Sequence, residues 1–170
     1  MFQHILLPTD GSLLSRDTAQ RAVAFAKAAN ATITAMYAKP TGHPENYGDL
    51  VEPAMLDRLA TGSDSKSKEY LGYIKKLCKD AGVECNALAV VNDTPWEAII
   101  NVAEDHHCDL IFMSKHGRGG LSSLLLGSET YRVLTHSSIP VLVYRPPELD
   151  ASRRKAKEKA REKERERKKA

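Results

Sequence analysis

The sequence predicts an α/β fold, namely an open, doubly wound, five-stranded parallel sheet with helices on both faces. Two observations support this prediction. Short apolar segments rich in strand-forming residues alternate along the chain with segments of helical periodicity, and such alternation produces parallel strands joined by right-handed helical crossovers. The run "LIFM" within "DLIFMS" (109–114) is also continuously apolar, which is typical of a strand buried on both faces.

The first elements lie close to the N-terminus. In "HILLPTD" the apolar residues 5–7 end against Pro8, as a short buried strand does. Ser12 is the predicted N-cap of a helix that continues to about Asn30, because alanine and valine recur there at helical spacing. The segment "ATITAMYA" (31–38) is rich in strand formers and predicts the second strand.

A loop and a long helix are predicted next. Residues 40–55 contain three prolines and two glycines, a composition typical of a loop. Helical character extends from near Pro53 to Asp80, and we expect an interruption around Gly62. Gly82 supplies the stop signal, since glycine readily takes the left-handed conformation that ends a helix.

The remaining elements complete the alternation. A strand is predicted over 83–91, followed by a helix start at "TPWE" (94–97). Its threonine would cap the helix, its proline would occupy the first turn, and its glutamate would complete a capping box. After the buried strand at 109–114, a helix over 128–136 and a last strand over 139–145 follow.

Charge divides the chain into two parts. Residues 151–170 carry 11 Lys/Arg against 4 Glu, a balance of +7, whereas residues 1–150 hold 14 Lys/Arg against 18 Asp/Glu, a balance of −4. We therefore expect a globular domain over 1–147 and a charged, basic tail over 148–170. The tail is either disordered or a solvated helix, and its charge would suit a weak acidic or nucleic-acid partner.

Composition also predicts the compartment. No apolar run approaches the roughly 20 residues of a membrane span, and the N-terminus lacks the basic lead and cleavage site of a secretory leader. The three cysteines, Cys78, Cys85 and Cys108, are odd in number and lack a Cys-x-x-Cys spacing, so reduced thiols are expected. We expect a cytoplasmic protein without a membrane partner.

The segment "SKHGRGGLSSLLLGSET" (114–130) holds four of the ten glycines. It leaves a predicted buried strand and enters a helix at Ser128, and a helix N-terminus offers unpaired N–H groups that suit phosphate. A tight turn, with Ser128 as an ordinary N-cap, would use the same residues. Neither of the common glycine-rich phosphate motifs is present, so glycine content alone leaves both interpretations open.

Spacing favours the first interpretation. Gly117, nine residues and then Gly127-Ser128 resemble the nucleotide-binding signature of the universal stress protein family, which reads Gly, two residues, Gly, nine residues, Gly and Ser or Thr. The segments "ILLPTDGS", "ATITAMYA" and "IPVLVYR" agree in order, so the resemblance spans about residues 2–145. One position departs, because Ser114 replaces the first glycine. Close approach to a ligand survives there if Ser114 keeps a negative φ.

The resemblance implies an adenine-nucleotide α-hydrolase-like fold and a site for ATP, with or without Mg. Asp10 and the main chain near Pro8 and Thr9 would contact the nucleoside, Ala38 would meet adenine through its backbone, and Met113 and Ser114 would line the base and ribose. The phosphates would be surrounded by Gly117, Arg118, Gly127, Ser128 and Glu129. His116 lies in the same loop, where it could touch phosphate. Asp10 has an alternative role as a helix cap, and a loop histidine such as His116 is ordinarily solvated.

The predicted function is therefore that of a universal stress protein which binds ATP or a related adenine nucleotide as a regulatory switch. The alternatives are a nucleotide-free interaction module and, less favoured, an adenylating or ATP-hydrolysing enzyme. No nucleophile–base pair or Ser-Gly-Gly-x-Asp-Ser loop is present, so we predict no catalytic residue and at most slow ATP hydrolysis. His106-His107-Cys108 lacks metal-ligand spacing, and no metal site is predicted.

The last strand predicts a partner. Residues Pro140, Val141, Leu142, Val143 and Tyr144 form an apolar segment that we expect at the edge of the sheet. An uncovered edge strand invites pairing with a second copy, and the resemblance also implies a two-fold dimer.

Overall fold

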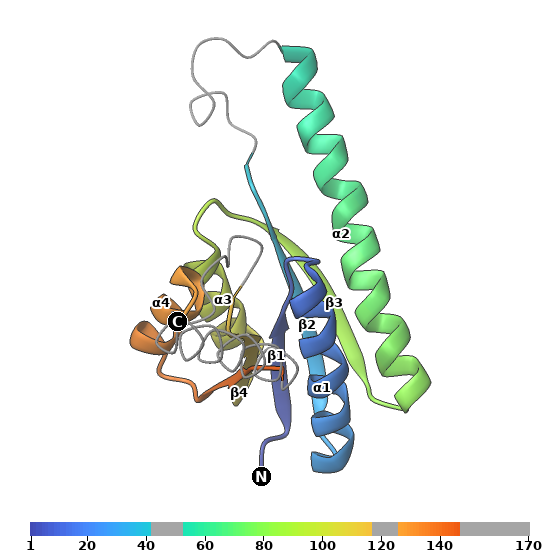
Figure 1. Cartoon of the computed structure of the whole chain (residues 1–170), viewed down its shortest axis with the longest axis vertical. Helices are drawn as coiled ribbons and strands as arrows, with labels where there is room; N and C mark the ends of the chain where they lie inside the picture. The colour runs from blue at the N-terminus through green and yellow to red at the C-terminus, as the bar shows by residue number, and fades with distance from the viewer. Residues whose placement is uncertain (42–52, 117–125, 147–170) are drawn as a thin grey trace, which may run out of the picture.

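A computed structural model describes residues 1–41, 53–116 and 126–146, and within α2 it describes the side chains only from Gly62 onward. Strands and helices alternate strictly along these residues (Figure 1). The elements are β1 (His4–Pro8), α1 (Leu13–Ala29), β2 (Thr32–Lys39), α2 (Pro53–Ala81), β3 (Cys85–Val91), α3 (Pro95–Asp105), β4 (Leu110–Ser114), α4 (Ser128–His136) and β5 (Val141–Tyr144). The predicted tail, residues 148–170, lies outside the described residues.

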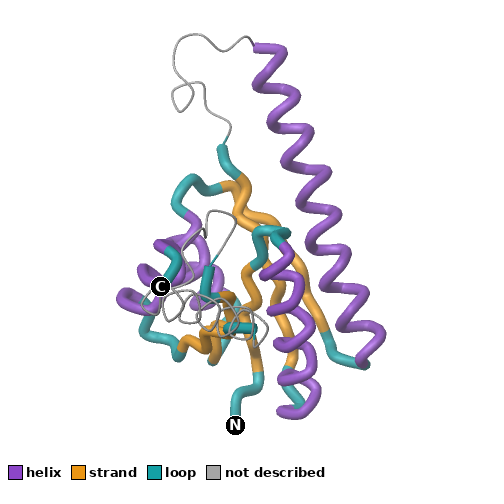
Figure 2. The backbone as a smooth tube through the Cα atoms, viewed as in Figure 1, coloured by secondary structure: helices purple, strands orange, loops and turns teal. Residues whose placement is uncertain are grey.

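The five strands form one parallel sheet in the order β3-β2-β1-β4-β5. Helices cover both faces of the sheet (Figure 2). Side chains on alternate strand positions point to opposite faces, so one strand contributes to two core layers. Ile5 and Leu7 of β1 pack in the layer under α1 and α2, whereas Leu6 packs in the layer under α3 and α4. The predicted α/β fold, open and doubly wound, is confirmed.

Local helix signals account for both ends of α1 and for the end of α2. Ser12 is the N-cap of α1, and its side chain accepts a hydrogen bond from the Ser15 amide, as predicted. Asn30 ends α1 in the left-handed conformation with φ 53°. Gly82 ends α2 with φ +72°, and the Val83 amide donates to the Cys78 carbonyl over 2.9 Å. These backbone bonds satisfy carbonyls that the helix leaves without partners.

Two predictions about helices were wrong. The helix α2 is continuous over Pro53–Ala81, without the interruption expected at Gly62. A single glycine in a helix costs only about 1 kcal/mol, which the buried contacts of Leu71 and Ile74 outweigh. The capping box at the start of α3 also does not form, because the Thr94 side chain makes no capping bond. The Trp96 amide donates instead to the Glu129 carboxylate of α4 over 2.9 Å.

Among the described residues, no helix combines the length and the apolar character that a membrane span requires.

Candidate functional site

The candidate site lies where the strands end, at the carboxyl edge of the sheet. The chain order reverses between β1 and β4, which are neighbours in the sheet although distant in sequence. After β1 the chain enters α1, and after β4 it leads to α4, so two helix N-termini follow the two central strands at this edge (Figure 1). In doubly wound sheets this switch point is where ligands bind.

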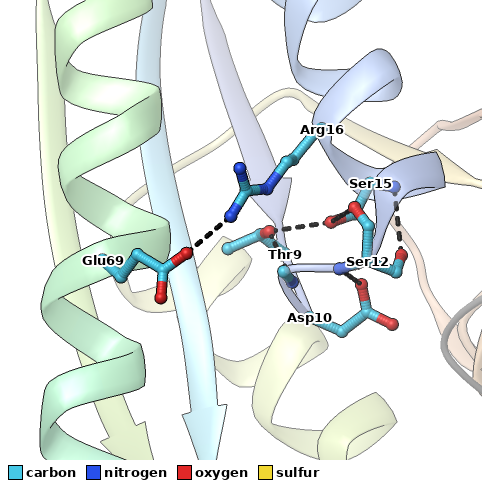
Figure 3. Close-up of polar contacts among 7 residues, drawn as sticks. Thr9, Asp10, Ser12, Ser15, Arg16 and Glu69 are labelled. Carbon is cyan, nitrogen blue, oxygen red and sulfur yellow. Dashed lines mark hydrogen bonds and ion pairs between the residues drawn. The ribbon is translucent and has the colours of Figure 1, made fainter.

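The loop from β1 to α1 is built by short-range hydrogen bonds (Figure 3). The Thr9 amide donates to the Met36 carbonyl of β2 over 2.9 Å, which fixes the loop to the sheet. Thr9 Oγ1 accepts from the Gly11 amide at 3.2 Å and shares a hydrogen bond with Ser15 Oγ at 3.0 Å. Side-chain acceptors therefore hold backbone N–H groups in a turn at the helix start.

Asp10 takes part in this turn. Its Oδ1 accepts from the Ser12 amide over 3.0 Å, while Ser12 itself caps α1. The carboxylate thus orders the residues before the helix, which corresponds in part to the alternative role predicted for it. Pro8, Thr9 and Asp10 are all half-buried, and the predicted adenine contact Ala38 is half-buried near the end of the neighbouring strand β2.

Gly11 is the residue here that sequence reasoning missed. Its φ is +75°, and a Cβ at this position would lie 2.3 Å from the Tyr70 ring of α2. Tyr70 packs edge-on against Tyr37, with the ring centroids 5.4 Å apart, so the ring is held in place. Arg16 and Glu69 add an ion pair of 2.6 Å between α1 and α2 beside this contact (Figure 3). An Asp-Gly pair after a strand is a known turn signal.

The end of β4 forms the other side of the site. Ser114 is the last residue of β4 and does not have a positive φ, so the condition set for serine at this position is met. Its hydroxyl donates to the His116 carbonyl over 2.7 Å. Its own carbonyl accepts from Thr130 Oγ1 of α4 over 3.0 Å. The serine side chain and the threonine together tie the start of the following segment to the strand and the helix.

Gly127 joins β4 to α4 by close backbone contact. Its amide donates to the Lys115 carbonyl over 2.9 Å, and a Cβ here would lie 3.2 Å from His116 Cα and from the Lys115 oxygen. Its φ is −62°, so it is space, and not backbone conformation, that favours glycine here. Gly127 is the N-cap of α4, which corrects the interpretation of Ser128 as the cap. Ser128 is the first helical residue and is exposed.

The other predicted residues fall into three groups. His116 is buried, with 9% of its surface exposed, so the expectation of a solvated loop histidine was wrong. Met113 is buried as well. Glu129 is half-buried, and its Oε2 accepts from the Trp96 amide, so this carboxylate stabilises the start of α3. Gly117 and Arg118 lie outside the described residues.

The histidines that end α3 do not join this site. His106 is the C-cap of α3, and His107 has φ 53°; both are exposed. Among the residues that the structure describes, no group of three His, Cys, Asp or Glu side chains is arranged to hold a metal ion.

Comparison with known proteins gives consistent results. The family model described as "Universal stress protein family" matches residues 1–145. Universal stress protein MJ0531 of Methanocaldococcus jannaschii is 29% identical over 148 residues, which cover 87% of this chain and 85% of that protein. The solved structure of protein MJ0577 from the same organism has a TM-score of 0.72 and 28% identity, and the match covers 86% of this chain and 97% of that one. A solved universal stress protein in complex with cAMP has a TM-score of 0.64 and 25% identity, covering 85% of this chain and 97% of that one.

Proposed function

The chain belongs to the universal stress protein family, and on this basis we propose that it binds ATP or a related adenine nucleotide as a regulatory ligand at the carboxyl edge of its sheet. The observation that carries the proposal is the position of two segments at the switch point. The Asp10 turn follows β1, the Gly127–Ser128 helix start follows β4 in the chain, and these two strands are neighbours in the sheet. The cAMP complex of a related protein supports an adenine nucleotide as the ligand class.

Each part of the site has a chemical role in this proposal. The N-terminus of α4 supplies backbone N–H groups and a partial positive charge for phosphate, with the exposed Ser128 hydroxyl as a further donor. Gly117 and Arg118 would extend this phosphate contact. Pro8, Thr9 and Asp10 would meet the nucleoside, and Ala38 would meet adenine through its backbone. Mg²⁺ would be held mainly by phosphate oxygens, as is usual for this ion.

The proposal assigns binding and not catalysis. The hydroxyl of Ser114 is engaged with the His116 carbonyl and the hydroxyl of Thr130 with the Ser114 carbonyl, so neither is poised as an activated nucleophile. Any hydrolysis of bound ATP is then slow and incidental. We also propose a cytoplasmic location, in keeping with the free thiols of Cys78, Cys85 and Cys108.

Calorimetric titration tests the binding. ATP with Mg²⁺, ATP with a chelator, AMP, cAMP and GTP are titrated in parallel, and we expect an adenine nucleotide to bind at micromolar or lower concentration, about −8 kcal/mol at 1 μM. Asp10→Asn should weaken binding about tenfold or more through loss of a charged hydrogen bond. Asp105→Asn is the matched control, because this exposed aspartate ends α3 just before β4 begins, at the amino ends of the strands. No binding of any adenine nucleotide would favour the interaction-module alternative.

We further propose that the protein forms a homodimer through β5 and Pro140. Among the described strands, β5 pairs with β4 alone and forms one edge of the sheet. All four of its residues are half-buried in the single chain. Leu142 and Tyr144 pack toward one core layer and Val141 toward the other. An edge strand with this apolar content can pair antiparallel with its symmetry mate.

Val143→Lys should convert the dimer to monomers. Val143 is half-buried but belongs to neither core layer, so a lysine there places like charges together across the two-fold axis with little effect on folding. The measurement is light scattering at high micromolar concentration, with thermal melting to verify the fold. Ala89→Lys on β3, the opposite edge strand, is the control and should remain dimeric. A wild-type protein that is already monomeric would refute the proposed interface.

A further inference from the structure

The α2–β3 corner places two of the three cysteines in one packing layer. Cys78 lies near the end of α2 and belongs to the core layer under α1 and α2, and Cys85, the first residue of β3, packs against the same layer. The Val83 amide nitrogen donates to the Cys78 carbonyl oxygen over 2.9 Å. This hydrogen bond holds the residues before β3 against the end of α2. Because residues two apart in a strand share a face, Cys85 and Ala87 of β3 both pack against this layer, which also contains Val83.

The two cysteine side chains lie in one core cluster, the layer under α1 and α2. Cys85 Sγ donates to the Asn86 carbonyl at 3.4 Å. From this juxtaposition we propose that Cys78 and Cys85 form a reversible disulfide, which makes the α2–β3 corner a redox-modification site. A disulfide requires Cα atoms about 4.4–6.8 Å apart, and the backbone bond from Val83 to Cys78 holds the two segments side by side.

The two thiols are not equivalent. Cys78 is fully buried, with 0% of its surface exposed, whereas Cys85 is half-buried. The hydrogen bond from Cys78 lowers the pKa of Cys85, and the Lys75 ammonium lowers it further. The same hydrogen bond, together with burial, raises the pKa of Cys78. Since the thiolate is the reactive form, Cys85 is the residue that reacts with an oxidant and Cys78 is the residue that resolves the product.

The oxidant in this reaction is a hydroperoxide. The Cys85 thiolate attacks the terminal peroxide oxygen; an S–O bond forms, the O–O bond breaks, and the leaving oxygen takes a proton to become water or an alcohol. The Cys78 sulfur then attacks the Cys85 sulfenic acid; the S–S bond forms, the S–O bond breaks, and hydroxide leaves as water with the Cys78 proton. Two thiols lose two electrons, and a dithiol reductant restores them.

This corner is remote from the candidate nucleotide site. Cys85 pairs with Ile33 at the start of β2, whereas Ala38 pairs with Val90 near the other end of the same two strands. Figure 1 shows the α2–β3 turn at the end of the sheet where β1 begins. Oxidation and nucleotide binding can therefore be measured independently.

The test is thiol counting on the full chain, followed by peptide mapping under non-reducing conditions. Treatment with hydrogen peroxide should lower the number of titratable thiols in denaturant from three to one, and mapping should recover a peptide that joins Cys78 to Cys85. Dithiothreitol should restore all three. Because Cys108 is buried in the opposite core layer and its burial raises its pKa to about 11, Cys108→Ser is the matched control and should still lose two thiols.

Variants of the pair separate the two steps. Cys78→Ala should trap Cys85 as a sulfenic acid that dimedone labels, whereas Cys85→Ala should leave Cys78 unreacted at the same peroxide dose. The wild-type thiol count requires no variant, so a folding defect in either one leaves the test valid. Retention of three thiols after peroxide, or a disulfide between protomers or to Cys108, would overturn the proposal.

Discussion

Gly11→Ala should destabilise the domain by about 3 kcal/mol, the sum of left-handed backbone strain and overpacking. Both terms act at this one position. The φ of Gly11 is +75°, which an alanine adopts only with strain, and the new methyl would lie 2.3 Å from the Tyr70 ring. The ring cannot turn away freely, since it packs edge-on against Tyr37. The measurement is the free energy of unfolding in urea.

Two other glycines separate the terms. Gly82 has φ +72° with open space around its Cβ position, so Gly82→Ala carries backbone strain alone and should cost about 1 kcal/mol. Gly72 lies inside α2 with nothing within 4 Å, so Gly72→Ala should stabilise the domain by about 0.5–1 kcal/mol. In a Tyr70→Ala background, Gly11→Ala should cost no more than Gly82→Ala does. Equal costs for Gly11→Ala with and without Tyr70 would show that the loop yields and that the contact is not a constraint.

The contrast between these glycines also shows how far the sequence could predict the structure. Gly82 and Ser12 act within a few residues of their own helix, and both were predicted correctly because capping is local. The role of Gly11 depends on Tyr70, 59 positions away in the sequence, and no local pattern encodes that contact.

The site shows the same division between local and long-range causes. The parallel arrangement of the strands followed from the alternating elements, whereas the strand order β3-β2-β1-β4-β5 comes from the structure. Glu129, however, caps α3 from across the helical layer, and its bond to the Trp96 amide replaces a capping box that the local spacing favoured. His116 is buried because Gly127 brings α4 against its backbone. These contacts arise from tertiary packing, which a pattern of single residues does not specify.

Gly127→Val should reduce affinity for the adenine nucleotide by about 100-fold or more, equivalent to about 2.7 kcal/mol. A Cβ at this position already lies 3.2 Å from His116 Cα and the Lys115 oxygen, and both of these are backbone atoms that cannot rotate away. Valine adds two further methyl groups. The 2.9 Å bond from the Gly127 amide to the Lys115 carbonyl must then lengthen, and the start of α4 moves away from the end of β4.

A shift of this kind removes binding because a phosphate requires donor distances of about 2.7–3.2 Å. Gly127→Ala should have an intermediate effect, since one methyl needs only a few tenths of an ångström. Gly72→Val, on open helix surface, is the control and should bind as the wild type does. Titration is performed well below each melting temperature. The emission of the single tryptophan, Trp96, reports the position of α4, because its ring packs against His136 of α4 with the ring centroids 4.8 Å apart. Wild-type affinity in a Gly127→Val variant with altered Trp96 emission would mean that phosphate is not bound at the start of α4, and the assignment of Gly127 and Ser128 would be wrong.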